Sequence, residues 1–170
     1  MARPRAQLAA AFTLVEALLA SVILAMTVAA MTMPFVAGAR SEQDDARRTL
    51  AVALAQEMME EVLATDFHDD KEKYHYLVGP DHGEKDRSDF DNMDDYNGYA
   101  EPPGKITDLD GQVIQDPAAT GLARFVTVAY VYVNGQDKGQ PPTFLRVTVE
   151  IWHEGTPIVR LARLVHETPQ

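Results

Sequence analysis

The residues most able to bind a ligand form a dense acidic run between Asp86 and Tyr99. Carboxylate oxygens at this density could hold Ca²⁺, a hard cation that takes several oxygen ligands. The spacing does not match the EF-hand pattern of alternating ligands. The alternative is a solvated loop held by Asx-turns, in which side-chain oxygens accept hydrogen bonds from nearby backbone N–H groups. Calcium is therefore the one cofactor considered, and its candidate ligands are Asp89, Asp91, Asp94 and Asp95.

Other residues that could carry catalysis do not form a recognisable site. The chain has no cysteine, which removes disulfides, thiolate metal sites and cysteine nucleophiles. It also lacks the nucleophile elbow, the P-loop and the zinc-binding His-Glu-x-x-His pattern. His68, His75 and His82 are interpreted as scattered surface residues, with a metal site as the alternative. Because a hydrolase needs acids whose pKa values are pushed apart, crowded carboxylates alone do not indicate one. The sequence predicts that the protein is not an enzyme.

Charge is unevenly distributed along the chain. The 170 residues carry a net charge of −11, which argues against nucleic-acid binding because phosphate contacts need clustered Lys and Arg. Between Asp66 and Asp110 there are 14 acidic and 5 basic residues. Most of the negative charge therefore belongs to one central segment.

Glu16 is the only charged residue between Phe12 and Ala39. The segment is long enough, at about 1.5 Å per helical residue, to cross a hydrocarbon core of about 30 Å. Arg3 and Arg5 precede it and predict a cytoplasmic N-terminus. A secretory signal would have a shorter apolar run, and a plain membrane anchor does not explain a costly acid. A third interpretation is that cleavage before Phe12 creates an α-amine, which Glu16 neutralises in its own chain or in a neighbouring subunit.

The stretch Ala11-Phe12-Thr13-Leu14-Val15-Glu16, with its basic leader and apolar continuation, resembles the processing motif of type IV pilin-like proteins. The resemblance implies that a prepilin peptidase cuts between Ala11 and Phe12 and methylates the Phe12 amine. It also implies that Glu16 pairs with the Phe12 amine of an adjacent subunit during assembly. Pro34 falls where such helices carry a helix-breaking proline, the alternative being a proline that ends the buried helix. The family usually has Gly before the cut, where this chain has Ala11.

The run from Phe90 to Gly98 resembles a segment of minor pilins of the mannose-sensitive haemagglutinin type. This resemblance implies a minor subunit of such a pilus. The alternatives are a minor pseudopilin of a type II secretion system and a membrane-anchored periplasmic binding module. The implied partners are other pilin or pseudopilin subunits, the prepilin peptidase and the inner membrane. The implied location is a single pass of the inner membrane with a periplasmic domain, followed by the filament.

Periodicity predicts the elements that must position these residues. Leu50, Leu54, Met58 and Val62 recur every four residues and predict an amphipathic helix. Val- and Tyr-rich or alternating segments predict strands at 125–133, 144–153 and 158–165, joined as an antiparallel meander. A long helix on a small antiparallel sheet makes an α+β fold, the layout that the pilin resemblance also implies. The expected organisation is a cleaved leader, an apolar helix, its amphipathic continuation, an acidic loop region and a sheet region, at residues 1–11, 12–39, 40–65, 66–123 and 124–170.

Overall fold

The computed structural model describes residues 13–67, 77–140 and 142–166. It divides into two units, residues 1–43 and 44–170, which are treated separately below. Helix α1, Leu14–Ala64, runs through the end of the first unit and the start of the second. The predicted cleavage between Ala11 and Phe12, together with the leader, lies outside the described residues. The same holds for His68 and His75.

The first unit contains the apolar part of α1, and this part is long and apolar enough to cross a membrane. Every residue from Thr13 to Gln43 is exposed. Pro34 lies inside α1, so it does not end the helix as the alternative interpretation expected. A kink at Pro34 stays a prediction. The exposed large side chains include Leu14, Leu18, Val22, Ile23, Met26, Met33 and Phe35.

In the second unit α1 buries one stripe of side chains. Ala51, Ala55, Met58 and Val62 are completely buried, and Leu54 is nearly so. Their spacing of three and four residues places them on one face of a helix, as the sequence predicted. Leu50 packs against the same core but stays partly exposed.

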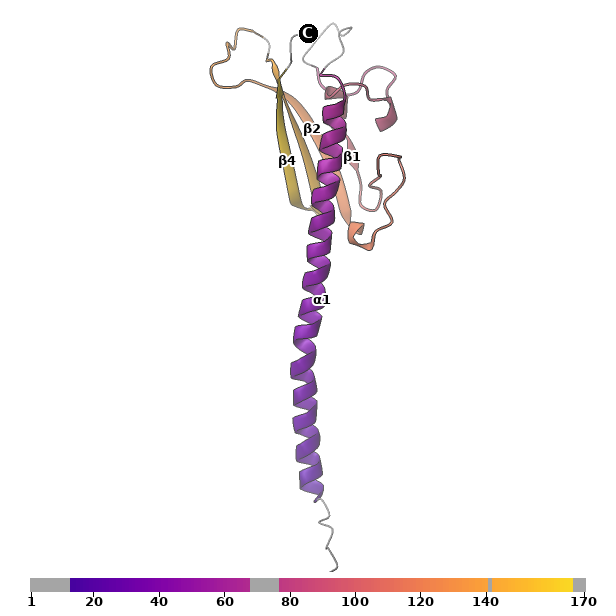
Figure 1. Ribbon diagram of the computed structural model, residues 1–170, viewed down its shortest axis with the longest axis vertical. Coiled ribbons are helices and arrows are strands. Elements are labelled where there is room, and N and C mark those ends of the chain that lie inside the picture. Colours follow the sequence, from indigo (N-terminus) through magenta and orange to yellow (C-terminus); the bar gives the residue numbers. More distant parts are fainter. Residues whose placement is uncertain (1–12, 68–76, 141, 167–170) are drawn as a thin grey trace, which may run out of the picture. The chain divides into compact units, whose positions relative to one another are not determined.

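The sheet has four antiparallel strands in the order β1-β2-β3-β4 (Figure 1). Strands β2, β3 and β4 form the expected meander, which confirms the α+β prediction. The strand at 144–153 was predicted at its full length, whereas β2 begins before Phe125 and β4 before Ile158. The bounds are β1 Ala100–Glu101, β2 Leu122–Val131, β3 Phe144–His153 and β4 Thr156–His166.

The core lies between one face of the sheet and the buried stripe of α1. Alternation along β3 places Leu145, Val147, Val149 and Ile151 on this face, and none of them is exposed to solvent. Side chains buried on both elements exclude water and supply most of the stabilisation of such an α+β unit.

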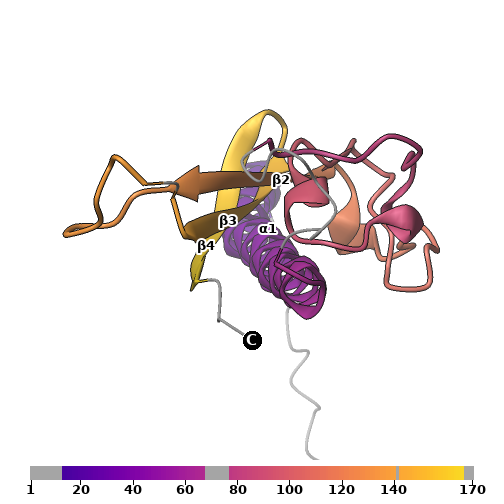
Figure 2. The same ribbon diagram turned by 90° about the horizontal axis from the view of Figure 1, so that it is seen from above.

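Residues 77–121 form an irregular region that includes β1 and lies beside β2, on the side of the sheet away from β4 (Figures 1 and 2). The region contains β1 and three short 3-10 helices, η1 Arg87–Asp89, η2 Asp94–Tyr96 and η3 Pro117–Ala119.

Candidate functional site

The acidic run folds so that only some of the predicted calcium ligands come together. Asp91 and Asp95 lie with Glu84 in one group, in which one carboxylate oxygen of each residue is within 4.8 Å of the others. Asp89 instead accepts hydrogen bonds from the backbone N–H groups of Lys85 and Asp86, at the start of η1. Calcium binding stays a prediction, and the geometry directs it to a set that includes Glu84.

Burial of this group favours protonation of its carboxylates. Burial and the neighbouring carboxylates raise the pKa of Glu84 above its ordinary value. Burial also raises the pKa of Asp95, although backbone N–H groups of Asn92 and Asp91 act against the rise. Three carboxylates at this separation repel one another, and either a shared proton or a bound cation relieves the repulsion.

Residues 92–96 of the run are buried, which corrects the expectation of a solvated loop for that part, whereas Asp86, Ser88, Asp89 and Asp91 are exposed as in a solvated loop. Asn92, Asp94, Asp95 and Tyr96 are each at most 2% exposed. The Asx-type bonds were anticipated correctly, because Asp95 Oδ2 accepts from the backbone N–H groups of Asp91 and Asn92 at 3.2 and 3.0 Å. Asn97 accepts from the backbone N–H of Val128, which ties the run to β2.

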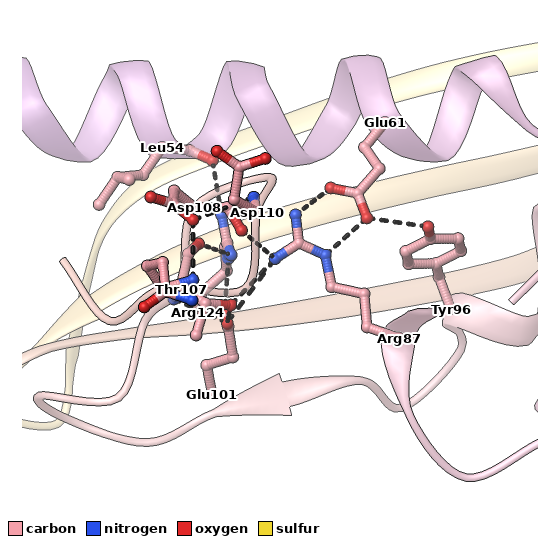
Figure 3. Close-up of polar contacts among 10 residues, drawn as sticks. Leu54, Glu61, Arg87, Tyr96, Glu101, Thr107, Asp108, Asp110 and Arg124 are labelled. Carbon is pink, nitrogen blue, oxygen red and sulfur yellow. Dashed lines mark hydrogen bonds and ion pairs between the residues drawn. The ribbon is translucent and has the colours of Figure 1, made fainter. Parts of the chain in front are cut away.

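A second group, centred on Arg124, joins the irregular region to the sheet and to α1 (Figure 3). Arg124 is completely buried, and its Nε lies 2.5 Å from Glu101 Oε2. It also donates to the backbone carbonyl of Thr107 at 2.9 Å and to that of Leu54 on α1 at 3.3 Å. Burial alone would raise the pKa of Glu101, but hydrogen bonds from Arg124 and Thr107 outweigh it and lower that pKa.

Arg87 extends this group to a second carboxylate (Figure 3). Its guanidinium donates through Nε and Nη2 to both oxygens of Glu61 on α1, a bidentate pair. Tyr96 donates its hydroxyl to the same carboxylate at 3.0 Å, and burial followed by the charge of Glu61 raises the pKa of Tyr96. Burial would lower the pKa of Arg87, but Glu61 more than compensates, so the guanidinium stays charged.

Two arginines and two glutamates thus form a neutral group in which each charge has a partner. Sequence reasoning missed it, because Glu61, Arg87, Glu101 and Arg124 are far apart in the chain and share no motif. A hollow of about 500 Å³ opens beside it, lined in part by Glu61, Arg87, Tyr99 and Asp110. Both guanidinium groups are bound to carboxylates and backbone carbonyls. The four residues Glu61, Arg87, Glu101 and Arg124, called the clamp below, therefore hold the irregular region, α1 and β2 together.

Glu16 occupies a local arrangement that the sequence analysis also missed. Its carboxylate accepts hydrogen bonds from the backbone N–H and the hydroxyl of Thr13, at 3.2 and 3.1 Å. The Thr13 hydroxyl in turn accepts from the backbone N–H of Glu16 at 3.3 Å. This is a capping box, and the spacing Thr-x-x-Glu ahead of an apolar run could have revealed it. Among the described residues Glu16 has no cationic partner.

Comparison with protein-family models, with curated proteins and with solved structures finds no match for the chain. The structure supports a conclusion about the arrangement of the secondary-structure elements. One long, apolar N-terminal helix continues into a helix packed on an antiparallel sheet, an arrangement compatible with the pilin-like fold.

Proposed function

We propose that this protein is a minor subunit of a type IV pilus-like filament. In this proposal a prepilin peptidase cuts between Ala11 and Phe12, and the apolar part of α1 holds the subunit in the inner membrane until assembly. The same surface then packs against other subunits, and the globular unit faces outward. The resemblance of the run from Phe90 to Gly98 favours a pilus over a secretion pseudopilus.

The observation that carries the proposal is the exposed apolar surface of α1 with one acid at its start. Leu14, Ile23 and Met33 are 79, 55 and 76% exposed, and no described side chain of the chain covers them. Such a surface needs a lipid or protein environment, because exposed apolar area in water is unfavourable. A role as a membrane anchor would account for the apolar surface but not for Glu16. A role as a filament subunit accounts for both, because Glu16 would pair with a neighbouring subunit.

Glu16 is expensive in an apolar environment, at about 2.5–3.5 kcal/mol for an acid at the membrane centre on insertion scales. The capping box with Thr13 satisfies hydrogen bonds of the carboxylate but supplies no positive charge. An α-ammonium at Phe12 of a neighbouring subunit would supply it. In that role the pair sets the axial position of the subunit more than it adds stability.

The test separates the charge of Glu16 from its capping role. Glu16→Gln keeps a capping-box residue but removes the charge, whereas Glu16→Ala removes both. We expect both variants to reach the membrane and to be at least about tenfold depleted from sheared filaments, because a subunit without this charge is not held at its axial position. Quantitative immunoblotting of membrane and filament fractions measures this.

Glu42→Gln is the matched control, since Glu42 is an exposed acid of the same helix outside the apolar stretch. It should assemble as the parent chain does. Normal incorporation of Glu16→Gln would contradict the charge-pairing mechanism, and intact residues 1–11 in the mature chain would favour an anchored binding module instead.

A further inference from the structure

Strand β4 occupies an edge of the sheet but does not have an edge strand's usual protection. The strand order leaves β1 and β4 at the two ends, and no described strand pairs with the outer side of β4. The β1 end is only two residues long and lies beside the irregular region (Figures 1 and 2). By contrast β4 is 11 residues long, so it presents a long row of backbone donors and acceptors on its outer side.

The side chains of β4 are also less covered than their neighbours. Val159, Leu161 and Val165 face the core but are only partly buried. Their partners on β3 are Ile151, Val149 and Leu145, all of which are fully buried. On the opposite face Leu164 is 52% exposed. Apolar residues on both faces are typical of a strand whose two faces are covered.

The proline and the bulge, two features that block edge pairing, are confined to the start of β4. Pro157 and the register shift opposite Ile151 and Trp152 both lie there. Beyond them, Val159 to His166 contains no proline, no glycine and no acid. Prolines, bulges and charges are the devices that discourage pairing, so this stretch is left open to another strand except for its two arginines.

The charges on this stretch indicate what kind of strand fits. Arg160 already pairs with Glu150 at 3.3 Å, whereas exposed Arg163 makes no ion pair with any described residue. Pairing two β4 edges would place the arginines of both copies on adjacent strands, which is unfavourable wherever two of them face each other. An acidic strand would neutralise them.

We propose that the edge of β4 from Val159 to His166 pairs with an extended acidic strand of a neighbouring subunit in the filament. Backbone hydrogen bonds would add the strand to the sheet, apolar side chains would cover Leu164, and an acid would pair with Arg163. The inference rests on the proposed filament role.

A photoreactive p-benzoylphenylalanine in place of Leu164 tests the contact in cells that make the filament. The full chain is irradiated, and crosslinked peptides are identified by mass spectrometry. The control carries the same residue in place of Leu109, which is 68% exposed in a turn of the irregular region. We expect a product from position 164 that position 109 does not give, attached to a peptide of net negative charge from another subunit.

Charge variants sharpen this result. Arg163→Glu should reduce the product at least about tenfold, whereas Arg163→Lys should retain it, since only the first reverses the charge. Backbone pairing is measured separately by hydrogen exchange, because added strand hydrogen bonds protect amides that side-chain contacts leave open. The amides of Val159–His166 that point away from β3 should exchange at least about tenfold more slowly in filaments than in detergent-solubilised chain.

Several outcomes would overturn the inference. In the crosslinking experiment these are a product joining β4 to β4 of a second copy, a crosslinked peptide without net negative charge, and no product although the processed chain is in filaments. The same holds if Arg163→Glu leaves the amount of product unchanged, or if the exchange rates of the β4 amides are the same in filaments and in detergent. If the chain is instead unprocessed and absent from filaments, the proposed function fails, and this inference fails with it.

Discussion

Two glutamates of α1 show how differently the two units satisfy a carboxylate. Glu61 has both oxygens bound by Arg87 and accepts a further hydrogen bond from Tyr96. Glu16 has only the capping box with Thr13. The apolar residues beside Glu61 are buried by the chain's own sheet, whereas those beside Glu16 are exposed. The comparison shows that Glu61 finds its cation, and its apolar neighbours find their cover, inside the globular unit, whereas the described residues supply neither to Glu16 and the apolar residues beside it.

Removing the cation at the centre of the clamp should have the largest effect on stability. Arg124→Ala removes the cation nearest to buried Glu101 and leaves it only Arg87 at 3.9 Å, and breaking comparable buried pairs costs about 3–5 kcal/mol. Trp152, the only tryptophan, reports unfolding by its fluorescence when the full chain is titrated with denaturant in detergent. Arg146→Ala is the control, because Arg146 is an exposed arginine of the same sheet and should change the free energy of unfolding by less than about 0.5 kcal/mol. A similar loss in both variants would show that the clamp is not what holds the irregular region.

The two glutamates themselves should respond differently to the same substitution. Glu61→Gln removes the charge that Arg87 pairs with and should cost about 1.5–3 kcal/mol in the same denaturant titration. Glu16→Gln should leave the unfolding of the globular unit unchanged within about 0.5 kcal/mol while preventing assembly. If Glu16→Gln destabilised the globular unit as much as Glu61→Gln, the contrast between the two units would be lost.

A smaller effect on stability is expected at the group of Glu84, Asp91 and Asp95. Because the pKa values of Glu84 and Asp95 are raised from 4.5 and 3.8, the folded state holds protons that the unfolded state releases, and stability falls as pH rises from about 4 through the raised values. The lowered pKa of Glu101 acts in the opposite sense, since its contribution is lost as pH falls below 4.5.

Glu84→Gln should therefore increase the free energy of unfolding at pH 7, by less than about 1 kcal/mol, and flatten its decline above pH 4. Glu60→Gln, at an exposed position of α1, is the control. Added Ca²⁺ tests the calcium prediction in the same assay, because a cation bound by Glu84, Asp91 and Asp95 would raise the unfolding midpoint of the parent chain more than that of Glu84→Gln. A pH profile unchanged by Glu84→Gln would show that solvent already screens the repulsion among these carboxylates.

Local patterns in the sequence predicted the secondary structure well. The stripe through Leu54 and Met58 and the alternation along 144–153 are short-range signals, because helix and strand periods need only nearby residues. The same kind of signal was present but overlooked at Thr13 and Glu16. What could not be predicted depends on pairing between distant residues. Arg124 lies 70 positions from the carbonyl of Leu54, and no local pattern specifies that contact.

The acidic run shows the same limit. Its density suggested a solvated loop or a metal site, yet the fold buries Asn92 and Asp95, and Asp95 accepts hydrogen bonds from the backbone N–H groups of Asp91 and Asn92. The carboxylates that gather include Glu84, which precedes the run from Asp86 to Tyr99 that supplied the candidate ligands. Residue density therefore indicated where charge accumulates, but only tertiary contacts decided which oxygens meet.

The proposed filament role depends most on a cleaved leader, and N-terminal analysis of the mature chain tests this directly. Purified filaments and membranes are analysed by intact mass and by sequencing of the first residues. The account predicts a chain that begins at Phe12 with a methylated α-amine, so that the position beside Glu16 carries the missing positive charge. A mature chain that retains residues 1–11 would contradict it, because Glu16 would then have no new amine to pair with.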